Sequence, residues 1–326
     1  MIPLSILELG RVRQGSDRRT ALDDARTLAQ HAERLGYRRI WVAEHHNSPA
    51  VTTAATSIVI AHIAAGTSSI RVGAGGIMLP NHAPYVIAEQ FGTLETLFPG
   101  RIDLGLGRAP GTDQNTLRAL RRSPANAENF PQDVRELQAF LAPDGAVQGI
   151  EAVPGSDTAV PLWILGSSLF GAQLAAAMGL PFGFASHFAP QALHQALALY
   201  RSGFKPSAQL DKPYALVGVN VIAADTHEEA RHLATSQQMS FADMFRGVRG
   251  LLQPPIEDIE AYWTPHEKYQ AGQMLACSVI GSRETVRSGL TGLVKKTRAD
   301  ELMIVSDVFD SAKRLRSLEL IAQAMA

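Results

Sequence analysis

Short apolar runs alternate along this chain with longer stretches in which apolar residues recur at every third or fourth position. The short runs are bounded by glycine, proline or polar residues and predict buried strands, whereas the longer pattern predicts amphipathic helices. The predicted strands cover residues 4–9, 39–44, 70–79, 102–106, 162–165, 182–185, 214–223 and 301–306. The helices predicted to follow them cover residues 20–35, 53–65, 85–97, 132–141, 169–178, 191–201, 228–244 and 312–324.

Eight strand–helix units in regular alternation predict an α/β fold with a parallel sheet, and eight strands are the number that closes a (β/α)8 TIM barrel. An open, doubly wound sheet with extra strands is the alternative. A barrel of this kind takes about 250 residues. The 326 residues therefore accommodate one barrel domain over 1–326 with additional loop.

Residues 247–273 interrupt the alternation after the seventh strand. They contain three prolines, several charges and the adjacent aromatic residues Tyr262 and Trp263. Prolines and mixed charges disfavour a packed element, so we expect an insertion that acts as a mobile lid and closes its aromatic side chains on a substrate. The alternative is a surface excursion that these aromatic residues anchor to the barrel.

The charges nearly cancel, with 30 Lys and Arg against 31 Asp and Glu, and there is no acidic or basic tail. Nothing therefore indicates a nucleic-acid or membrane-surface partner. Residues 158–200 carry no Asp, Glu, Lys or Arg, but glycines and Pro181 divide them into pieces shorter than the roughly 20 residues of a membrane span. The single cysteine, Cys277, excludes an internal disulfide. The N-terminus lacks a secretory pattern, so we expect a cytoplasmic protein.

In a barrel, the loops at the C-terminal ends of the strands surround one mouth, where the chemistry takes place. Gly166, Ser167 and Ser168 join the fifth strand to its helix. Backbone N–H groups at the start of a helix bind anions, although capping of that helix by serine is an equal alternative. Arg108, at the end of the fourth strand, and Arg118 are candidates to supply positive charge to a phosphate at this turn.

Gly75 and Gly76 lie inside the third strand, where glycine indicates a bulge or the close approach of a flat ligand; tight packing inside the barrel is the alternative. His45 and His46 are adjacent on an extended segment, so their side chains point to opposite sides and cannot readily chelate one metal. We predict no metal site. One imidazole should face the mouth and transfer protons near neutral pH; a structural histidine is the alternative.

Several of these segments occur together in one known family. The chain resembles the bacterial luciferase-like flavin-dependent monooxygenase superfamily, in its single-chain bacterial members of uncharacterised substrate. Four motifs match in the family's order, and the resemblance extends over nearly the whole chain. They are residues 41–46 (the Glu-His-His segment), 72–80, 99–108, and 111–115 followed by 118–120.

The resemblance implies roles for individual residues. His45 matches an active-site histidine, and Gly75 and Gly76 match a non-proline cis peptide bulge against which the flavin ring lies. Arg108 and Arg118 match phosphate-binding arginines, and the turn 166–168 matches the phosphate-binding turn. The strand-end rule adds further candidates. These are Ser186 as a cofactor contact, and His46, His187, Tyr262 and Trp263 as walls of the active site.

The expected activity is oxidation of a small organic substrate with reduced FMN and O2. Gly107 stands where luciferase carries a reactive cysteine, and the segment after Arg108 is shorter, so light emission is not expected. No nicotinamide motif is visible, which favours a separate NAD(P)H:flavin reductase. The alternatives are an F420-dependent hydride-transfer enzyme and a flavin-binding protein without catalysis.

A homodimer is also expected. No charged residue lies between Glu44 and Arg71, so the second helix has no charged face to present to water. Luciferase-like proteins pair through the helices that follow strands two and three, which agrees with this pattern. A loop of the same chain covering the helix is the alternative.

Overall fold

The computed structural model describes residues 2–109, 113–143 and 145–326, and it has eight parallel strands closed into a barrel. Neighbouring strands follow one another around the sheet in chain order, and pairing of the sixth with the seventh and of the eighth with the first closes it. The closure confirms the predicted TIM barrel and excludes the open sheet. The barrel strands are β1 (Leu4–Glu8), β2 (Arg39–Val42), β3 (Arg71–Met78), β4 (Ile102–Gly107), β7 (Leu162–Gly166), β8 (Phe182–Phe184), β9 (Ala215–Ala223) and β11 (Glu301–Val305).

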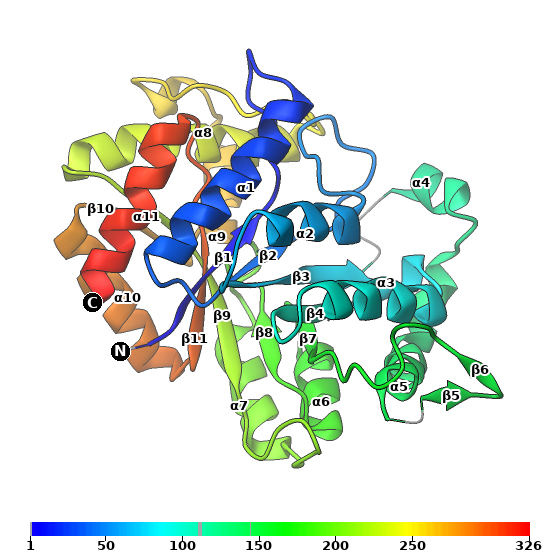
Figure 1. Cartoon of the computed structure of the whole chain (residues 1–326). Helices are drawn as coiled ribbons and strands as arrows, with labels where there is room; N and C mark the ends of the chain where they lie inside the picture. The colour runs from blue at the N-terminus through cyan, green and yellow to red at the C-terminus, as the bar shows by residue number, and fades with distance from the viewer. Residues whose placement is uncertain (1, 110–112, 144) are drawn as a thin grey trace.

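Helices surround the strands, as Figure 1 shows. Their apolar faces pack on the outward side chains of the strands and form the main hydrophobic core. All eight predicted helices are present, and no end is shifted by more than three residues. They are α1 (Arg18–Arg34), α2 (Thr56–Ala65), α3 (Pro84–Leu97), α5 (Phe130–Leu141), α6 (Leu169–Met178), α7 (Leu193–Gly203), α8 (His227–Phe245) and α11 (Ser311–Met325).

The sequence interpretation missed several elements. β10 (Ser278–Gly281) pairs with the C-terminal half of β9, and α10 (Arg283–Thr297) follows it. β10 has only four residues, too few for a clear period. The long β4–β7 connection also holds α4 (Gln114–Ala119) and a small hairpin of β5 (Ala146–Val147) and β6 (Ile150–Glu151).

The expectation of no packed element within 247–273 was wrong. The segment holds a 3₁₀ turn, η3 (Ile259–Ala261), and most of α9 (Pro265–Met274). Thr264 and Glu267 form a reciprocal capping box at the start of α9, and Pro265 occupies the first turn. Proline is compatible with that position because its missing N–H would have no partner within the helix. The residue that suggested a helix breaker therefore begins a helix.

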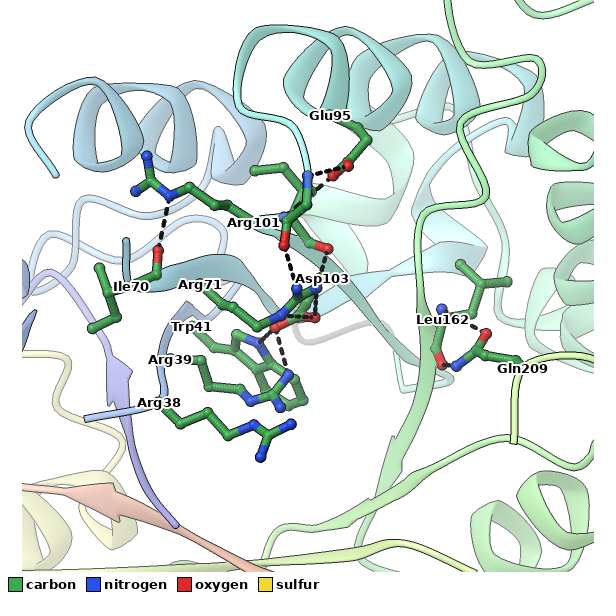
Figure 2. Close-up of polar contacts among 12 residues, drawn as sticks. Arg38, Arg39, Trp41, Ile70, Arg71, Glu95, Arg101, Asp103, Leu162 and Gln209 are labelled. Carbon is green, nitrogen blue, oxygen red and sulfur yellow. Dashed lines mark hydrogen bonds and ion pairs between the residues drawn. The ribbon is translucent and has the colours of Figure 1, made fainter. Parts of the chain in front are cut away.

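Buried charges fill the N-terminal end of the barrel (Figure 2). Arg39, the first residue of β2, donates Nη1 to Asp103 at 2.6 Å and Nε to Glu301 at 2.8 Å. Asp103 also accepts from Trp41 and Arg71, at 3.1 Å and 2.6 Å. Arg39, Asp103 and Glu301 are each at most 3% exposed. This network fills the N-terminal end of the barrel, opposite the mouth formed by the C-terminal ends of the strands.

Candidate active site at the barrel mouth

Glu44, just beyond the end of β2, is the centre of the polar contacts at the mouth. Its side chain is buried and accepts hydrogen bonds from His46 Nε2 at 2.7 Å and His82 Nε2 at 2.9 Å. It also accepts the backbone N–H of Met78 at 2.9 Å and the amide of Asn81 at 3.3 Å. Burial by itself would raise the pKa of Glu44, but these hydrogen bonds outweigh it and lower the pKa to about 2.

His45 points away from this cluster, as the alternation of an extended segment predicts. Its side chain reaches solvent in the mouth, while the surrounding protein still removes part of its hydration. Desolvation is the main cause that lowers the pKa of His45 below the usual histidine value. Arg11 and His46 lower it further and Glu44 opposes them. His45 is therefore largely neutral at neutral pH and able to accept a proton.

His187, beyond β8, lies within electrostatic range of His45. Its Nδ1 packs against Gly218, where an added Cβ would come within 2.5 Å of that nitrogen. Nδ1 is buried and has no hydrogen-bond partner in the part of the chain that the structure describes. Desolvation lowers the pKa of His187 to about 4, with His45 as a second cause. The imidazole is thus neutral in the physiological range.

The peptide bond between Gly75 and Gly76 is cis, as the resemblance implied, and the register with β4 shifts between Gly75 and Ile77. A Cβ on Gly75 would come within 2.9 Å of Leu7 and Trp41 side-chain atoms. A Cβ on Gly76 would lie 2.5 Å from the carbonyl oxygen of Gly105. Tight packing inside the barrel, the alternative considered from the sequence, thus explains why both positions are glycine.

Arg108 lies beside the turn 166–168. Its guanidinium stacks on Phe170, in the first turn of α6, at 4.3 Å from the ring centroid, and its Nε donates to the carbonyl oxygen of Ala127 at 3.1 Å. Ser168 occupies the N-cap position of α6, but its side chain accepts no hydrogen bond from the helix. Within the described residues, the start of α6 therefore lies next to an arginine without a capping hydrogen bond from Ser168, and capping by this serine does not explain the turn.

The other predicted contacts are placed differently. Arg118 lies on α4, which stands out from the barrel in Figure 1, and its exposed side chain forms no hydrogen bond or ion pair with any described residue. Residues 110–112, which include the start of the motif 111–115, lie outside the described residues. Ser186 is fully buried and donates its hydroxyl to the carbonyl oxygen of Gly218 at 2.6 Å. Its hydroxyl therefore has a partner inside the protein core and is not exposed as the predicted cofactor contact would require.

Tyr262 and Trp263 lie on the segment 247–273. Tyr262 donates its hydroxyl to Asp243 of α8 at 2.7 Å, and Arg246 stacks on its ring at 4.7 Å. Trp263 donates to Glu260 in the same segment at 3.3 Å. Tyr262 thus anchors the segment to α8, which is the role that the alternative interpretation gave it.

The same segment also reaches the mouth through Arg249. Arg249 Nη1 donates to the backbone oxygen of Asn47 at 3.1 Å and to the Asp113 carboxylate at 3.2 Å. Asn47 in turn donates to Asp113 at 2.9 Å. These contacts join the loops after β2 and β4 to the segment that follows α8.

Sequence reasoning picked out Glu44 at the end of a strand, as part of the Glu-His-His segment, but gave it no role, and it missed His82. His82 follows the short turn η1 (Leu79–Asn81) immediately after β3, so the strand-end rule would have found it had the search continued four residues beyond the strand. The side-chain nitrogens of His46 and His82 and a Glu44 oxygen lie within 4.8 Å of one another, a spacing that a metal ion can use. Adjacent His45 and His46, by contrast, diverge as predicted.

The profile of the luciferase-like monooxygenases matches residues 2–301. The chain belongs to the luciferase-like monooxygenase family. Among its relatives in this family, it is 52% identical to the uncharacterised protein YvbT of Bacillus subtilis, over 98% of this chain and 95% of that one. It is 51% identical to a luciferase-like monooxygenase of Escherichia coli K12, over 98% and 96% of the two chains.

Solved structures place this luciferase-like protein among barrels with two kinds of cofactor. The crystal structure of apo-MsnO8 superposes with a TM-score of 0.91 at 35% identity, covering 100% of this chain and 98% of the other. The oxygenating constituent of 3,6-diketocamphane monooxygenase in complex with FMN, from a Pseudomonas putida plasmid, gives a TM-score of 0.76 at 18% identity, covering 100% and 98%. An F420-dependent secondary alcohol dehydrogenase gives 0.70 at 12%, covering 100% and 99%. The last two similarities concern the fold alone.

Proposed function

We propose that this protein is a monooxygenase that uses reduced FMN and O2 to oxidise a small organic substrate. The observation that carries the proposal is the position of Arg108 beside the uncapped start of α6. A helix N-terminus with a neighbouring guanidinium suits a phosphate group, and the flavin ring would then lie toward the cis bulge at Gly75 and Gly76. Reduced flavin supplies the electrons for the reaction with dioxygen.

The residues of the mouth have separate tasks in this proposal. His45 accepts or donates the proton that the oxygen chemistry requires, and its lowered pKa keeps it ready to accept one at neutral pH. His187 forms part of the substrate wall as a neutral imidazole. The segment 247–273 acts as a lid that limits the entry of water.

Removing the proposed phosphate contact gives a direct test. Arg108→Ala should weaken FMN binding by about 1.5–3 kcal/mol, or on the order of tenfold or more, because a charged hydrogen bond is lost. Riboflavin, which has no phosphate, should bind nearly as before. Flavin fluorescence titration measures both ligands. Arg118→Ala should act in the same direction if α4 closes over the phosphate, and Arg135→Ala on exposed α5 surface serves as the control. Equal losses for FMN and riboflavin would remove Arg108 from the phosphate site.

A turnover assay distinguishes the cofactors. F420 remains the alternative cofactor, because its phosphate can use the same turn and F420-dependent proteins share the fold. Reduced FMN with O2 and F420 are therefore offered in parallel to the purified protein. If only F420 supported turnover, the protein would be a hydride-transfer enzyme and not a monooxygenase. Reduced FMN oxidised at the same rate with and without protein would favour a non-catalytic flavin carrier.

The lid proposal makes a prediction about Arg249. Proteolysis within 247–273 should slow when FMN is bound, because closure buries the segment. Arg249→Ala should be cleaved about as fast with FMN as without it, since the contacts to Asn47 and Asp113 are lost. Lys268→Ala, which removes an ion pair inside the segment, is the matched control. Cleavage that is insensitive to FMN in the unaltered protein would identify a fixed excursion rather than a lid.

Homodimerisation is proposed through α2 and α3. Helix α2 carries no charged residue, and Ile58 on it is 69% exposed, while Val86 on α3 is 41% exposed. Exposed apolar side chains on two adjacent helices favour burial against a second copy. Ile58→Glu should convert a dimer to a monomer in sedimentation at micromolar concentration, whereas Tyr269→Glu on α9 should not. A monomer without any substitution would refute the dimer.

The electrons for FMN would come from a separate NAD(P)H:flavin reductase.

Within the described residues, no helix is both long and apolar enough to cross a membrane.

A further inference from the structure

The contacts of Glu44 lead beyond the roles described so far. Two histidines from different segments, one just beyond β2 and one after β3, direct the same ring nitrogen, Nε2, at a single buried carboxylate. The end of β3 also adds the backbone N–H of Met78 and the side-chain amide of Asn81. Four donors therefore converge on one carboxylate, and together they connect two strand ends of the barrel mouth.

The acceptor determines the protonation of the rings. Carboxylate oxygens of an ionised glutamate only accept hydrogen bonds, so each Nε2 facing Glu44 must carry a hydrogen. In a neutral imidazole the other nitrogen, Nδ1, is then unprotonated and able to accept a proton. The rings of His46 and His82 are partly exposed, with side-chain exposures of 16% and 26%, while Glu44 is buried. The Nδ1 edge of each ring is thus not the edge that contacts the carboxylate.

A carboxylate that holds a histidine in one tautomer is a known means of preparing a proton acceptor. It fixes the ring orientation and stabilises the imidazolium that forms when the proton arrives. Hydrogen bonds to the charged form keep Glu44 ionised despite burial, which supports this use of the residue.

A metal ion is the competing explanation for the cluster, since the three ligand atoms lie within 4.8 Å. The nitrogen–oxygen separations of 2.7 and 2.9 Å are hydrogen-bond distances. They are shorter than the separation of about 3.3 Å between ligands in a tetrahedral zinc site with bonds of about 2.0 Å. The backbone N–H of Met78 holds the other carboxylate oxygen, Oε2, in a hydrogen bond as well.

We propose that Glu44 is a positioning residue that holds His46 and His82 with Nε2 protonated, so that their Nδ1 atoms serve as additional proton acceptors in the mouth. This inference rests on the proposed function, which it extends from the single proton-transfer residue His45 to a second group of imidazoles. It explains why His46, which faces away from His45, lies at the site.

Histidine tautomers in the flavin-free protein provide the first test. Nitrogen-15 NMR of histidine-labelled protein should show the rings of His46 and His82 protonated at Nε2 only. Their signals are assigned by their disappearance in His46→Gln and His82→Gln respectively. Glu44→Gln should alter the tautomer of at least one ring, because a neutral amide presents one acceptor oxygen and one NH2 donor. A proton on Nδ1 and none on Nε2 of His46 and His82 in the unaltered protein would overturn the proposal. This readout does not depend on flavin and remains valid even if the proposed function fails.

Turnover provides the second test. Glu44→Gln should lower kcat roughly 10²-fold, within the range of lost acid–base assistance, with little change in FMN affinity. Glu33→Gln is the matched control, because Glu33 is also a carboxylate with several hydrogen-bond donors and a lowered pKa, but it belongs to α1 and contacts the loop before β3. Equal kcat losses in both variants would reduce Glu44 to a structural role. Stoichiometric zinc bound after dialysis against Zn²⁺, and lost in Glu44→Gln, would establish the metal site instead.

Discussion

Arg39→Met is expected to lower the free energy of unfolding by about 3–5 kcal/mol, the range for a buried ion pair that loses one partner. Arg39 lies between Glu301 and Asp103 at the closed end of the barrel, and all three side chains are nearly inaccessible to solvent. Methionine fills similar space but leaves Glu301 as a buried charge without its closest cation. Asp103 keeps Arg71 and is less affected. The shift of the urea midpoint at constant slope measures the loss.

Two further variants test the cause of that loss. Arg19→Met removes the exposed ion pair with Asp23 on α1 and should leave the urea midpoint nearly unchanged, because water screens exposed charges. Adding Glu301→Gln to Arg39→Met should recover part of the loss, because the uncompensated charge is removed. The amide oxygen can still accept from one of the two hydroxyls of Ser5 and Tyr214, and the NH2 group can donate to the other. If the double variant were less stable than Arg39→Met, hydrogen-bond geometry rather than charge would determine the effect.

His45→Ala is expected to lower oxygen-coupled oxidation by about 10² to 10⁴, the usual contribution of a general acid or base, while folding and FMN affinity change little. The structure supports the expectation that folding changes little, because the side chain of His45 is exposed and forms no hydrogen bond with any described residue. Substrate oxidation and flavin binding are measured on the same preparation. His46→Ala should differ by also disturbing Glu44.

The pH dependence gives an independent check on His45. The surrounding protein lowers its pKa, so the neutral, proton-accepting form persists below the pH at which a free histidine would be half protonated. Activity should therefore be maintained at and above neutral pH and should fall as the pH decreases through a value below about 6.5. This acidic limb should disappear in the residual activity of His45→Ala. An unchanged limb would mean that another group, such as His187, controls it.

The sequence by itself determined the barrel, because each strand–helix unit has its own apolar period, and periodicity is a local property. Eight local patterns sufficed to predict the number of barrel strands, and each predicted helix was found within a few residues of its expected ends. The divergence of His45 and His46 was also predictable, since successive side chains of an extended segment point to opposite sides. The order of the family motifs identified the family that the profile then confirmed.

Tertiary structure decided which side chains meet. His82 is 38 residues from Glu44 in the chain, and no local pattern shows that the turn η1 brings its ring onto that carboxylate. The position of Arg108 on Phe170 likewise depends on the pairing of β4 with β7. Tyr262 lies in a segment whose composition suggested a lid, but the side chains of Asp243 in α8 and of Arg246 at its C-terminal end hold it. Contacts between distant segments depend on the closure of the barrel, and its geometry is set by all eight strands together.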